Sequence, residues 1–249
     1  ASDYREDAVL SGVPTVGCRR CGGGLFGAAY YSNVLEGARM AERSTSDVVL
    51  VEGSGPTLPP VACDTTLLVC SAASSPEEAL DGPAYYRLLL ADAVLLTGCD
   101  APSVQPEQVE ALAGKVQRER GGIPVFRTSF RPEPRSSVAG KRVFLATTGP
   151  AEASEKAARL LARDHGCEVV GLTANLSDRP ALEADLETGL EAAEVLLTEV
   201  KAAAIDIAVR AARERGKEVS FLHNAVVPEE KQSFGEFCAH AARPRVRGA

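Results

Sequence analysis

The stretch RVFLATTGPAEASEKAARLLARDHGCEVVGL, residues 142–172, decides the fold predicted for this sequence. It contains an apolar run at 142–147, an amphipathic pattern at 152–165 and a second apolar run at 168–172. Both runs are continuous, whereas a strand covered on one face only would alternate apolar and polar residues. Strand, helix and strand in this order predict a right-handed βαβ unit whose strands are covered on both faces.

The same rhythm continues in both directions along the chain. We expect further buried strands at residues 13–18, 48–52, 66–71, 93–97, 195–198 and 218–222. Amphipathic patterns predict helices at residues 32–43, 106–120, 180–191 and 202–215. The predicted fold class is therefore α/β, with a mostly parallel, doubly wound sheet followed by a second, smaller α/β domain.

Residues 130–140 break this rhythm, because the segment combines prolines, serines, a glycine and several charges without an apolar period. Such a composition is typical of a linker. We therefore place a domain boundary between residues 134 and 135. The first domain is predicted to cover residues 1–134 and the second residues 135–249.

The composition limits the classes of partner. Apolar residues make up 45% of the 249 residues, so a sizeable core can form. The net charge of -7 argues against nucleic acid or an anionic membrane as the main partner, but a small anionic substrate is compatible where basic residues gather locally. Seven cysteines without a secretory leader, and no apolar run near the roughly 20 residues of a membrane span, predict a cytoplasmic location. A homodimer is compatible with these features.

The segment TVGCRRCGGG, residues 15–24, carries the strongest chemical signal. A predicted strand leads into Arg19 and Arg20, and three glycines follow, namely Gly22, Gly23 and Gly24. Guanidinium groups match phosphate oxygens, and glycines leave backbone amides accessible to an anion. We interpret the segment as a phosphate-binding loop, in which Arg20 is a candidate catalytic residue as well. The alternative is a flexible glycine turn whose arginines face water.

The segment DVVLVEGSG, residues 47–55, places Glu52 directly after a predicted buried strand. Open α/β sheets bind ligands at the carboxyl ends of their strands. A carboxylate at such a position can hold Mg²⁺ or accept a proton. We interpret Glu52 as a catalytic and metal-binding residue. The alternative is an exposed carboxylate in an ordinary turn.

Four further residues are candidate phosphate ligands. Ser32 and Asn33 open a predicted helix, where Ser32 is expected to be the N-cap and could also reach a phosphate. Arg179 follows Ser177 and Asp178, either of which can cap the helix at 180–191. Lys201 follows the predicted strand at 195–198 and is a candidate catalytic residue as well. The alternatives are a helix cap without a ligand role at Ser32, a position beside the capped helix start without a ligand role at Arg179, and a solvated lysine at Lys201.

The chain contains no G-x-x-x-x-G-K-[ST] sequence. ATP-binding P-loop enzymes need this sequence between a strand and a helix. Either that loop lies upstream of residue 1, or ATP is not the substrate.

Taken together, the segments resemble the cyclic 2,3-diphosphoglycerate synthetase family. In the first half the resemblance rests on ASDYREDA at 1–8, VGCRRCGGG at 16–24, SNVLEGA at 32–38, VVLVEGSG at 48–55 and PPV at 59–61. In the second half it rests on NLSDRPAL at 175–182 and EVKAAAID at 199–206. The resemblance spans nearly the whole chain, and the motifs are specific in combination.

This resemblance implies a P-loop NTPase-like core that is incomplete here, with ATP and Mg²⁺ as cofactors and a small phosphorylated acid as substrate. Family members are longer, so the resemblance implies a fragment that is inactive alone. Residues 1–134 would be the carboxyl-terminal portion of the catalytic domain, and residues 135–249 would contribute to the substrate site. The implied reaction forms an intramolecular phosphoanhydride from 2,3-diphosphoglycerate. Two alternatives stay open: another P-loop kinase or amide ligase acting on a small acid, and a non-catalytic anion-binding module.

Overall fold

The computed structural model describes residues 4, 7–8, 11–23, 27–53, 58, 60–200 and 203–243, and it contains two compact units. The first unit is built from residues up to Ser129 and from Val227 onward. The second unit is Phe130–Val226. The chain passes between the units twice, once within strand β5 (Val125–Pro134) and once within strand β9 (Glu218–Pro228).

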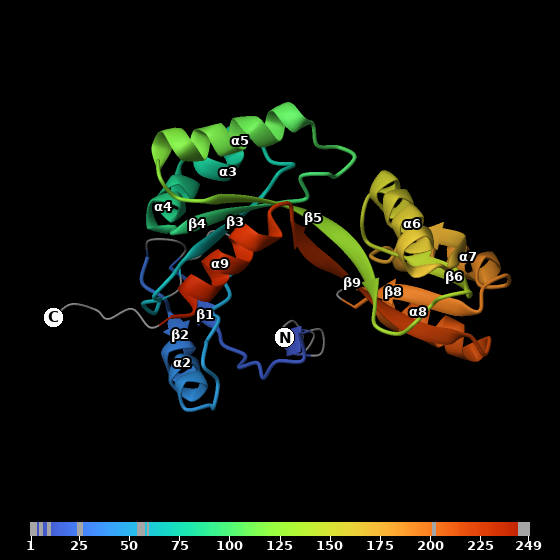
Figure 1. The fold of residues 1–249 in the computed structure, drawn as a ribbon. Helices are drawn as coiled ribbons and strands as arrows, with labels where there is room; N and C mark the ends of the chain where they lie inside the picture. Colours follow the sequence, from blue (N-terminus) through green and yellow to red (C-terminus); the bar gives the residue numbers. More distant parts are fainter. Residues whose placement is uncertain are drawn as a thin grey trace. The chain divides into compact units, whose positions relative to one another are not determined.

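The first unit has a parallel sheet with helices on both faces. Strands β3 (Leu67–Ser71), β4 (Ala93–Thr97) and β5 hydrogen-bond in this order. Helices α3 (Pro76–Leu80), α4 (Pro83–Leu90) and α5 (Pro106–Glu119) bury one face, and α9 (Lys231–Ala241) covers the other (Figure 1). A helix from the end of the chain therefore completes the unit that the beginning of the chain forms.

A small hairpin and a helix precede this sheet. Strands β1 (Arg20–Cys21) and β2 (Tyr31–Ser32) pair antiparallel, and helix α2 (Val34–Glu42) follows directly. Most residues between 11 and 53 are exposed among the described residues.

The second unit repeats the same two-faced arrangement. Strands β9, β8 (Val195–Glu199), β6 (Arg142–Ala146) and β7 (Glu168–Thr173) lie in this order and run parallel. Helix α6 (Ala151–His165) packs on one face of these strands, and α7 (Arg179–Gly189) and α8 (Ile205–Glu214) pack on the other. Side chains alternate between the two cores along β6, with Val143 and Leu145 facing α6 and Phe144 facing α7 and α8.

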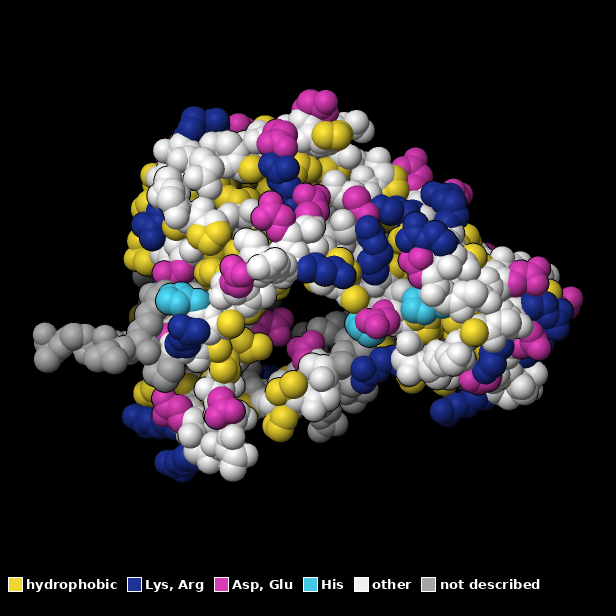
Figure 2. Space-filling model, viewed as in Figure 1, with side chains coloured by type: hydrophobic (Ala, Val, Ile, Leu, Met, Phe, Trp, Pro, Cys, Tyr) yellow, Lys and Arg dark blue, Asp and Glu magenta, His cyan; other side chains and the backbone are white. Residues whose placement is uncertain are grey.

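The predicted fold class is confirmed, since the structure is α/β with a mostly parallel sheet and helices on both faces. Two predicted strands are wrong, because residues 13–18 and 48–52 form none. Their apolar side chains are not covered by a second layer, and Leu50 is 89% exposed. Hydrophobic side chains at the surface of the viewed face are coloured yellow in Figure 2. An apolar run becomes a buried strand only where neighbouring elements pack on it.

The predicted linker is also partly wrong, because β5 continues through Pro134. The Arg135 amide donates to the Phe221 carbonyl at 2.8 Å and the Glu229 amide to the Arg127 carbonyl at 2.9 Å, so β5 and β9 pair antiparallel. In such a ladder alternate residues point their N–H groups away from the partner. The prolines at 132 and 134 occupy those positions, so they leave the ladder intact.

The division into units differs from the predicted boundary between residues 134 and 135. The structure divides β5 after Ser129 and returns residues from Val227 onward to the first unit. The physical reason for the second difference is aromatic packing. The ring of Phe126 lies 5.0 Å from that of Phe234 and 5.3 Å from that of Phe237, both on α9.

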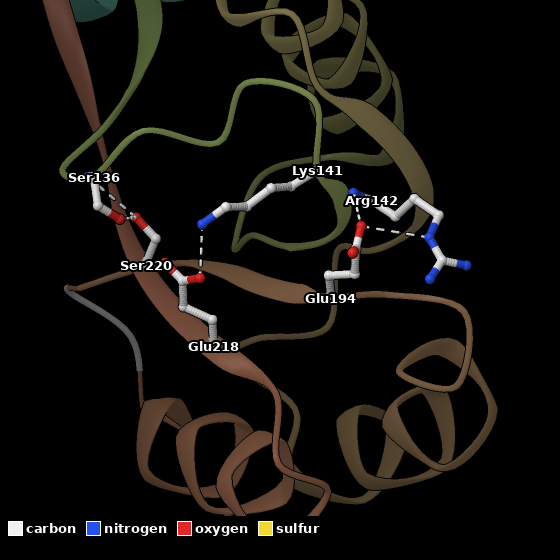
Figure 3. Close-up of polar contacts among 6 residues, drawn as sticks. All are labelled: Ser136, Lys141, Arg142, Glu194, Glu218 and Ser220. Carbon is white, nitrogen blue, oxygen red and sulfur yellow. Dashed lines mark hydrogen bonds and ion pairs between the residues drawn. The ribbon is translucent and has the colours of Figure 1, made fainter.

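Charged side chains link the amino ends of the strands in the second unit. Glu194 accepts a hydrogen bond from the Arg142 amide at 2.9 Å, and Lys141 pairs with Glu218 at 2.7 Å (Figure 3). In the same unit the Ser136 hydroxyl donates to the Ser220 hydroxyl oxygen at 2.7 Å. The Arg142 amide, together with the charges of Arg142 and Lys141, holds the pKa of Glu194 below its usual range.

We expect Glu194→Gln to remove a small, pH-dependent contribution to stability. A carboxyl group whose pKa is lower in the folded state than in the unfolded state stabilises the fold above the unfolded value, about 4.3. That contribution is lost as the pH falls through the folded pKa. The urea midpoint of the variant should therefore lie below that of the wild type at neutral pH and approach it in acid. Glu191→Gln is the control, because the Glu191 carboxylate has no partner within the described residues. Equal shifts in both variants would contradict the role of Glu194.

Within the part of the chain that the structure describes, every helix is too short or too polar to cross a lipid bilayer.

Candidate functional site

The hairpin that carries the arginine–glycine segment is held by backbone and side-chain hydrogen bonds. The Arg19 amide donates to the Asn33 side-chain oxygen at 2.6 Å, and the Asn33 amide donates back to the Arg19 carbonyl at 3.0 Å. At the other end of the ladder, the Tyr30 amide donates to the Cys21 carbonyl at 2.8 Å. These bonds fix the two strands on either side of the glycines, so the loop between them has fixed ends.

Arg20 contacts the loop that follows it. One guanidinium nitrogen, Nη1, donates to the Gly22 carbonyl at 3.3 Å, and Nη2 donates to the Gly27 carbonyl at 3.1 Å. The half-buried side chain of Arg20 thus spans the loop from one side to the other.

Two glycines of this loop cannot be replaced without strain. Gly22 and Gly23 have φ angles of 78° and 80°, which other residues rarely adopt. A Cβ atom at Gly23 would in addition overlap the carbonyl oxygens of Gly27 and Ala28. The predicted Gly24 lies outside the described residues.

Arg19 differs from Arg20 in its surroundings. Its side chain is exposed, and its guanidinium group makes no hydrogen bond or ion pair within the described part of the chain. A planar, permanently charged group in this state is available to an anion.

The two polar residues after the loop have structural roles. Asn33, not Ser32, is the N-cap of α2, and it caps through its backbone position without a side-chain bond to the helix. The Ser32 hydroxyl accepts a hydrogen bond from the Val34 amide at 3.4 Å. The predicted N-cap is therefore wrong by one residue, because Ser32 belongs to β2 and pairs with Arg20. The structure brings together Arg19, Arg20, Gly22, Gly23, Ser32 and Asn33 in one hairpin.

Glu52 is exposed and follows a segment that forms no strand, so the predicted strand-end position is wrong. Its carboxylate makes no hydrogen bond or ion pair to another described residue. No group of three or more histidine, cysteine or acidic side chains that could hold a metal occurs among the described residues. Glu52 stays a predicted metal ligand.

The candidate Arg179 is the first residue of α7, which follows β7 along the chain. Asp178 caps α7 by accepting a hydrogen bond from the Ala181 amide at 3.2 Å, which confirms the predicted cap. Arg179 donates to Asp206 at 2.8 Å and to the Ala203 carbonyl at 3.1 Å. The Arg179 guanidinium thus links α7 to the start of α8. Lys201 lies outside the described residues.

Sequence reasoning missed one polar contact between the ends of β6 and β8. Thr148, in the loop after β6, donates to one oxygen of Glu199, at the end of β8, from its amide at 2.9 Å and from its hydroxyl at 2.7 Å. The strand order reverses between β6 and β8, and ligands of α/β sheets commonly bind at such a point. The signal was the TGP sequence at 148–150, which lies between a predicted strand and a predicted helix.

The cysteines form no disulfide among the described residues. Four of them are exposed, at positions 18, 21, 63 and 238. Burial raises the pKa of the thiols of Cys70, Cys99 and Cys167, so these three are poor nucleophiles near neutral pH.

Comparison with known proteins finds one family along most of the chain. Residues 1–128 match the P-loop domain of cyclic 2,3-diphosphoglycerate synthetase, and residues 134–225 match the C-terminal domain of the same enzyme. The hairpin, the glycine loop and Glu52 all lie in the first match.

Curated relatives of this chain are themselves named cyclic 2,3-diphosphoglycerate synthetase. The cyclic 2,3-diphosphoglycerate synthetase of Rubrobacter xylanophilus is 43% identical over 92% of this chain and 52% of its own length. That of Methanothermus fervidus is 40% identical over 94% of this chain and 51% of its own length. This chain spans about half the length of the curated relatives it matches.

A solved structure similar to this chain is that of LpxK from Aquifex aeolicus in complex with ATP. It is 14% identical with a TM-score of 0.34, over 72% of this chain and 53% of LpxK. The two family matches cover the P-loop domain and the C-terminal domain in the order in which the two predicted domains occur. The chain therefore belongs to the cyclic 2,3-diphosphoglycerate synthetase family.

Proposed function

We propose that this chain supplies the substrate-phosphate site of a cytoplasmic ATP-dependent synthetase that closes 2,3-diphosphoglycerate into its cyclic phosphoanhydride. The observation that carries the proposal is the exposed guanidinium of Arg19 beside a glycine loop, inside the segment that matches the family's P-loop domain. The names of the relatives support the reaction, since each is called a cyclic 2,3-diphosphoglycerate synthetase.

The reaction needs positive charge because two phosphate groups must approach each other. Each phosphate monoester carries about −1.5 to −2 charges at neutral pH. In the proposed sequence, ATP transfers its γ-phosphoryl group to one substrate phosphate and ADP leaves. An oxygen of the neighbouring, unmodified phosphate then attacks the phosphorus atom of the phosphorylated one, at the phosphorus that is ester-linked to the glycerate. The new intramolecular P–O–P bond forms as inorganic phosphate is expelled.

The residues of this chain position the reactants in this scheme. Arg19 and Arg20, together with the backbone amides of Gly22 and Gly23, form the site for the substrate phosphates. Phosphoryl transfer depends mainly on such positioning and on charge neutralisation. Lys201 and Arg179 stay predicted phosphate ligands from the second unit.

Mg²⁺ fits the residues of this chain only in part. The ion is commonly held by one or two carboxylates together with substrate phosphates and water. Glu52 offers one exposed carboxylate of this kind. When bound, Mg²⁺ would neutralise charge on the phosphates, and Glu52 would hold it or one of its waters.

The phosphates of ATP do not fit this sequence, because it contains no Walker loop. We propose that residues found in the longer relatives, and not in these 249, bind the nucleotide. This chain would then bind the acid substrate without the nucleotide. Conversion of the substrate would need the full-length protein, meaning this chain joined to the part that its relatives carry in addition.

The full-length protein tests the proposal directly. Incubated with ATP, Mg²⁺ and 2,3-diphosphoglycerate, it should form the cyclic product, which phosphorus NMR detects. One ADP should be released for each molecule of cyclic product. ATP consumption with a different small acid, and no cyclic product, would favour a different kinase or ligase. Binding of 2,3-diphosphoglycerate without any turnover by the full-length protein would favour a non-catalytic anion-binding module.

A further inference from the structure

The two adjacent arginines occupy different positions at the start of the hairpin. Successive side chains of a β-strand point to opposite faces. Arg20 pairs with Ser32 in the β1–β2 ladder, while Arg19 directly precedes β1 and exchanges hydrogen bonds with Asn33. We expect the alternation to direct the two guanidinium groups to different faces of the hairpin.

Arg20 is already committed to its own loop. Its two terminal nitrogens donate to the carbonyls of Gly22 and Gly27, which lie on either side of the loop. To bind a phosphate with these nitrogens, Arg20 would have to leave both carbonyls. Donating to peptide oxygens from two nitrogens of one rigid, planar group also fixes the distance between the two sides of the loop, which a flexible lysine ammonium cannot do.

Arg19 has the opposite properties. Its backbone is clamped on both sides by Asn33, through bonds of 2.6 and 3.0 Å, while its side chain is exposed and unpaired among the described residues. Because the backbone of Arg19 is already fixed, binding of an anion by its guanidinium costs little further backbone entropy. Planar forks of this kind match the oxygens of a phosphate monoester.

We infer that the two arginines divide two tasks: Arg19 binds a phosphate of the substrate directly, and Arg20 is a positioning residue that holds the glycine loop beside it. Asn33 is a second positioning residue, because it sets the backbone of Arg19. This inference rests on the proposed function and assigns different roles to two residues that the sequence alone treats alike.

Conservative and non-conservative variants of both arginines separate the two roles. In calorimetric titrations of the 249-residue chain with 2,3-diphosphoglycerate, Arg19→Ala should weaken binding by about tenfold or more, and Arg19→Lys should restore part of the loss because the charge remains. Arg20→Ala and Arg20→Lys should have dissociation constants within about twofold of each other, both weaker than the wild type. The reason is that neither alanine nor lysine can span the two loop carbonyls.

Salt dependence gives a readout that loop disorder alone does not change. Removal of a direct ion pair reduces the dependence of affinity on salt concentration, since one screened charge interaction is gone. We expect Arg19→Ala to flatten the salt dependence and Arg20→Lys to leave it at the wild-type slope. Strong rescue by Arg20→Lys, together with an unchanged affinity in Arg19→Ala, would overturn the assignment.

Thiol labelling locates the bound anion on one face of the hairpin. Cys21 is exposed and lies two residues after Arg19, so an extended backbone would place it about 7 Å away on the same side as Arg19. Saturating 2,3-diphosphoglycerate should slow alkylation of Cys21 about fivefold or more, because the ligand blocks access and its negative charge disfavours the thiolate. Cys238 on α9 is the control and should label at an unchanged rate.

Failure of this inference and failure of the proposed function give different results. Unprotected Cys21 with undiminished binding by Arg19→Ala overturns the division of tasks, even where the full-length protein makes cyclic product. Absence of any binding to the wild-type chain also counts against the inference. Absence of cyclic product from the full-length protein, with Cys21 protected, leaves Arg19 as a phosphate ligand and rejects the reaction.

Discussion

Replacing Phe126 with alanine is expected to lower the free energy of unfolding of the first unit by about 3–5 kcal/mol, the usual cost of removing a buried phenylalanine. Phe126 is 6% exposed and lies on β5 beside Ala93 and Leu95 of β4. Its ring packs against Phe234 at an interplanar angle of 73°, an edge-to-face arrangement that adds to the hydrophobic contribution. The large effect follows because one ring joins the sheet to a helix from the opposite end of the chain.

Loss of this ring should also release α9. Limited proteolysis should cleave Phe126→Ala within residues 231–241 faster than it cleaves the wild type, and urea unfolding followed by circular dichroism gives the free energy. Phe130→Ala is the matched control on the same strand, because that ring is 41% exposed. We expect the control to cost about 1 kcal/mol or less. Similar losses in both variants would contradict the packing of α9 on the first unit.

Replacing Glu52 with glutamine should have the largest effect on turnover. In the full-length protein we expect kcat to fall by about 10²- to 10³-fold, because the neutral amide neither binds Mg²⁺ as a carboxylate does nor accepts a proton. The Mg²⁺ concentration needed for half-maximal rate should rise at the same time. A rate assay across a series of Mg²⁺ concentrations measures both quantities.

Asp47→Asn is the control for Glu52→Gln. Asp47 is an exposed carboxylate at the other end of the same apolar run, so the substitution changes charge by the same amount without touching the proposed site. We expect it to leave kcat and the Mg²⁺ dependence within about twofold. An unchanged Mg²⁺ dependence in Glu52→Gln would remove Glu52 from the metal site.

The sequence predicted those strands that are buried on both faces. The run at 93–97 coincides with β4, and the run at 142–147 extends one residue beyond β6. Burial explains this success, since four of the five residues of β4 and of β6 are buried. Apolar content then reports strand position almost directly.

Prediction failed where a strand has a polar composition or where an apolar run is exposed. β5 carries polar and charged residues and two prolines, so its composition resembled a linker, although its hydrogen bonds to β9 make it a strand. The run at 48–52 is strongly apolar, yet the described structure leaves it exposed and unpaired. Strand pairing depends on partners distant in sequence, which local composition does not report.

The candidate site shows the same limit. The glycine loop and its two arginines could be recognised from residue types alone, since those types suit a phosphate. The separate surroundings of Arg19 and Arg20 could not, because they depend on where the short strand β1 begins and on the loop carbonyls that Arg20 reaches. A shift of one residue in that register would exchange the faces of the two arginines.

The central claim is that the hairpin of this chain receives the acid substrate rather than the nucleotide. Steady-state kinetics of Arg19→Ala in the full-length protein tests it most directly, with 2,3-diphosphoglycerate and ATP varied in turn. We predict that KM for 2,3-diphosphoglycerate rises about tenfold or more while KM for ATP stays within about twofold. A rise in KM for ATP with an unchanged KM for 2,3-diphosphoglycerate would contradict the claim.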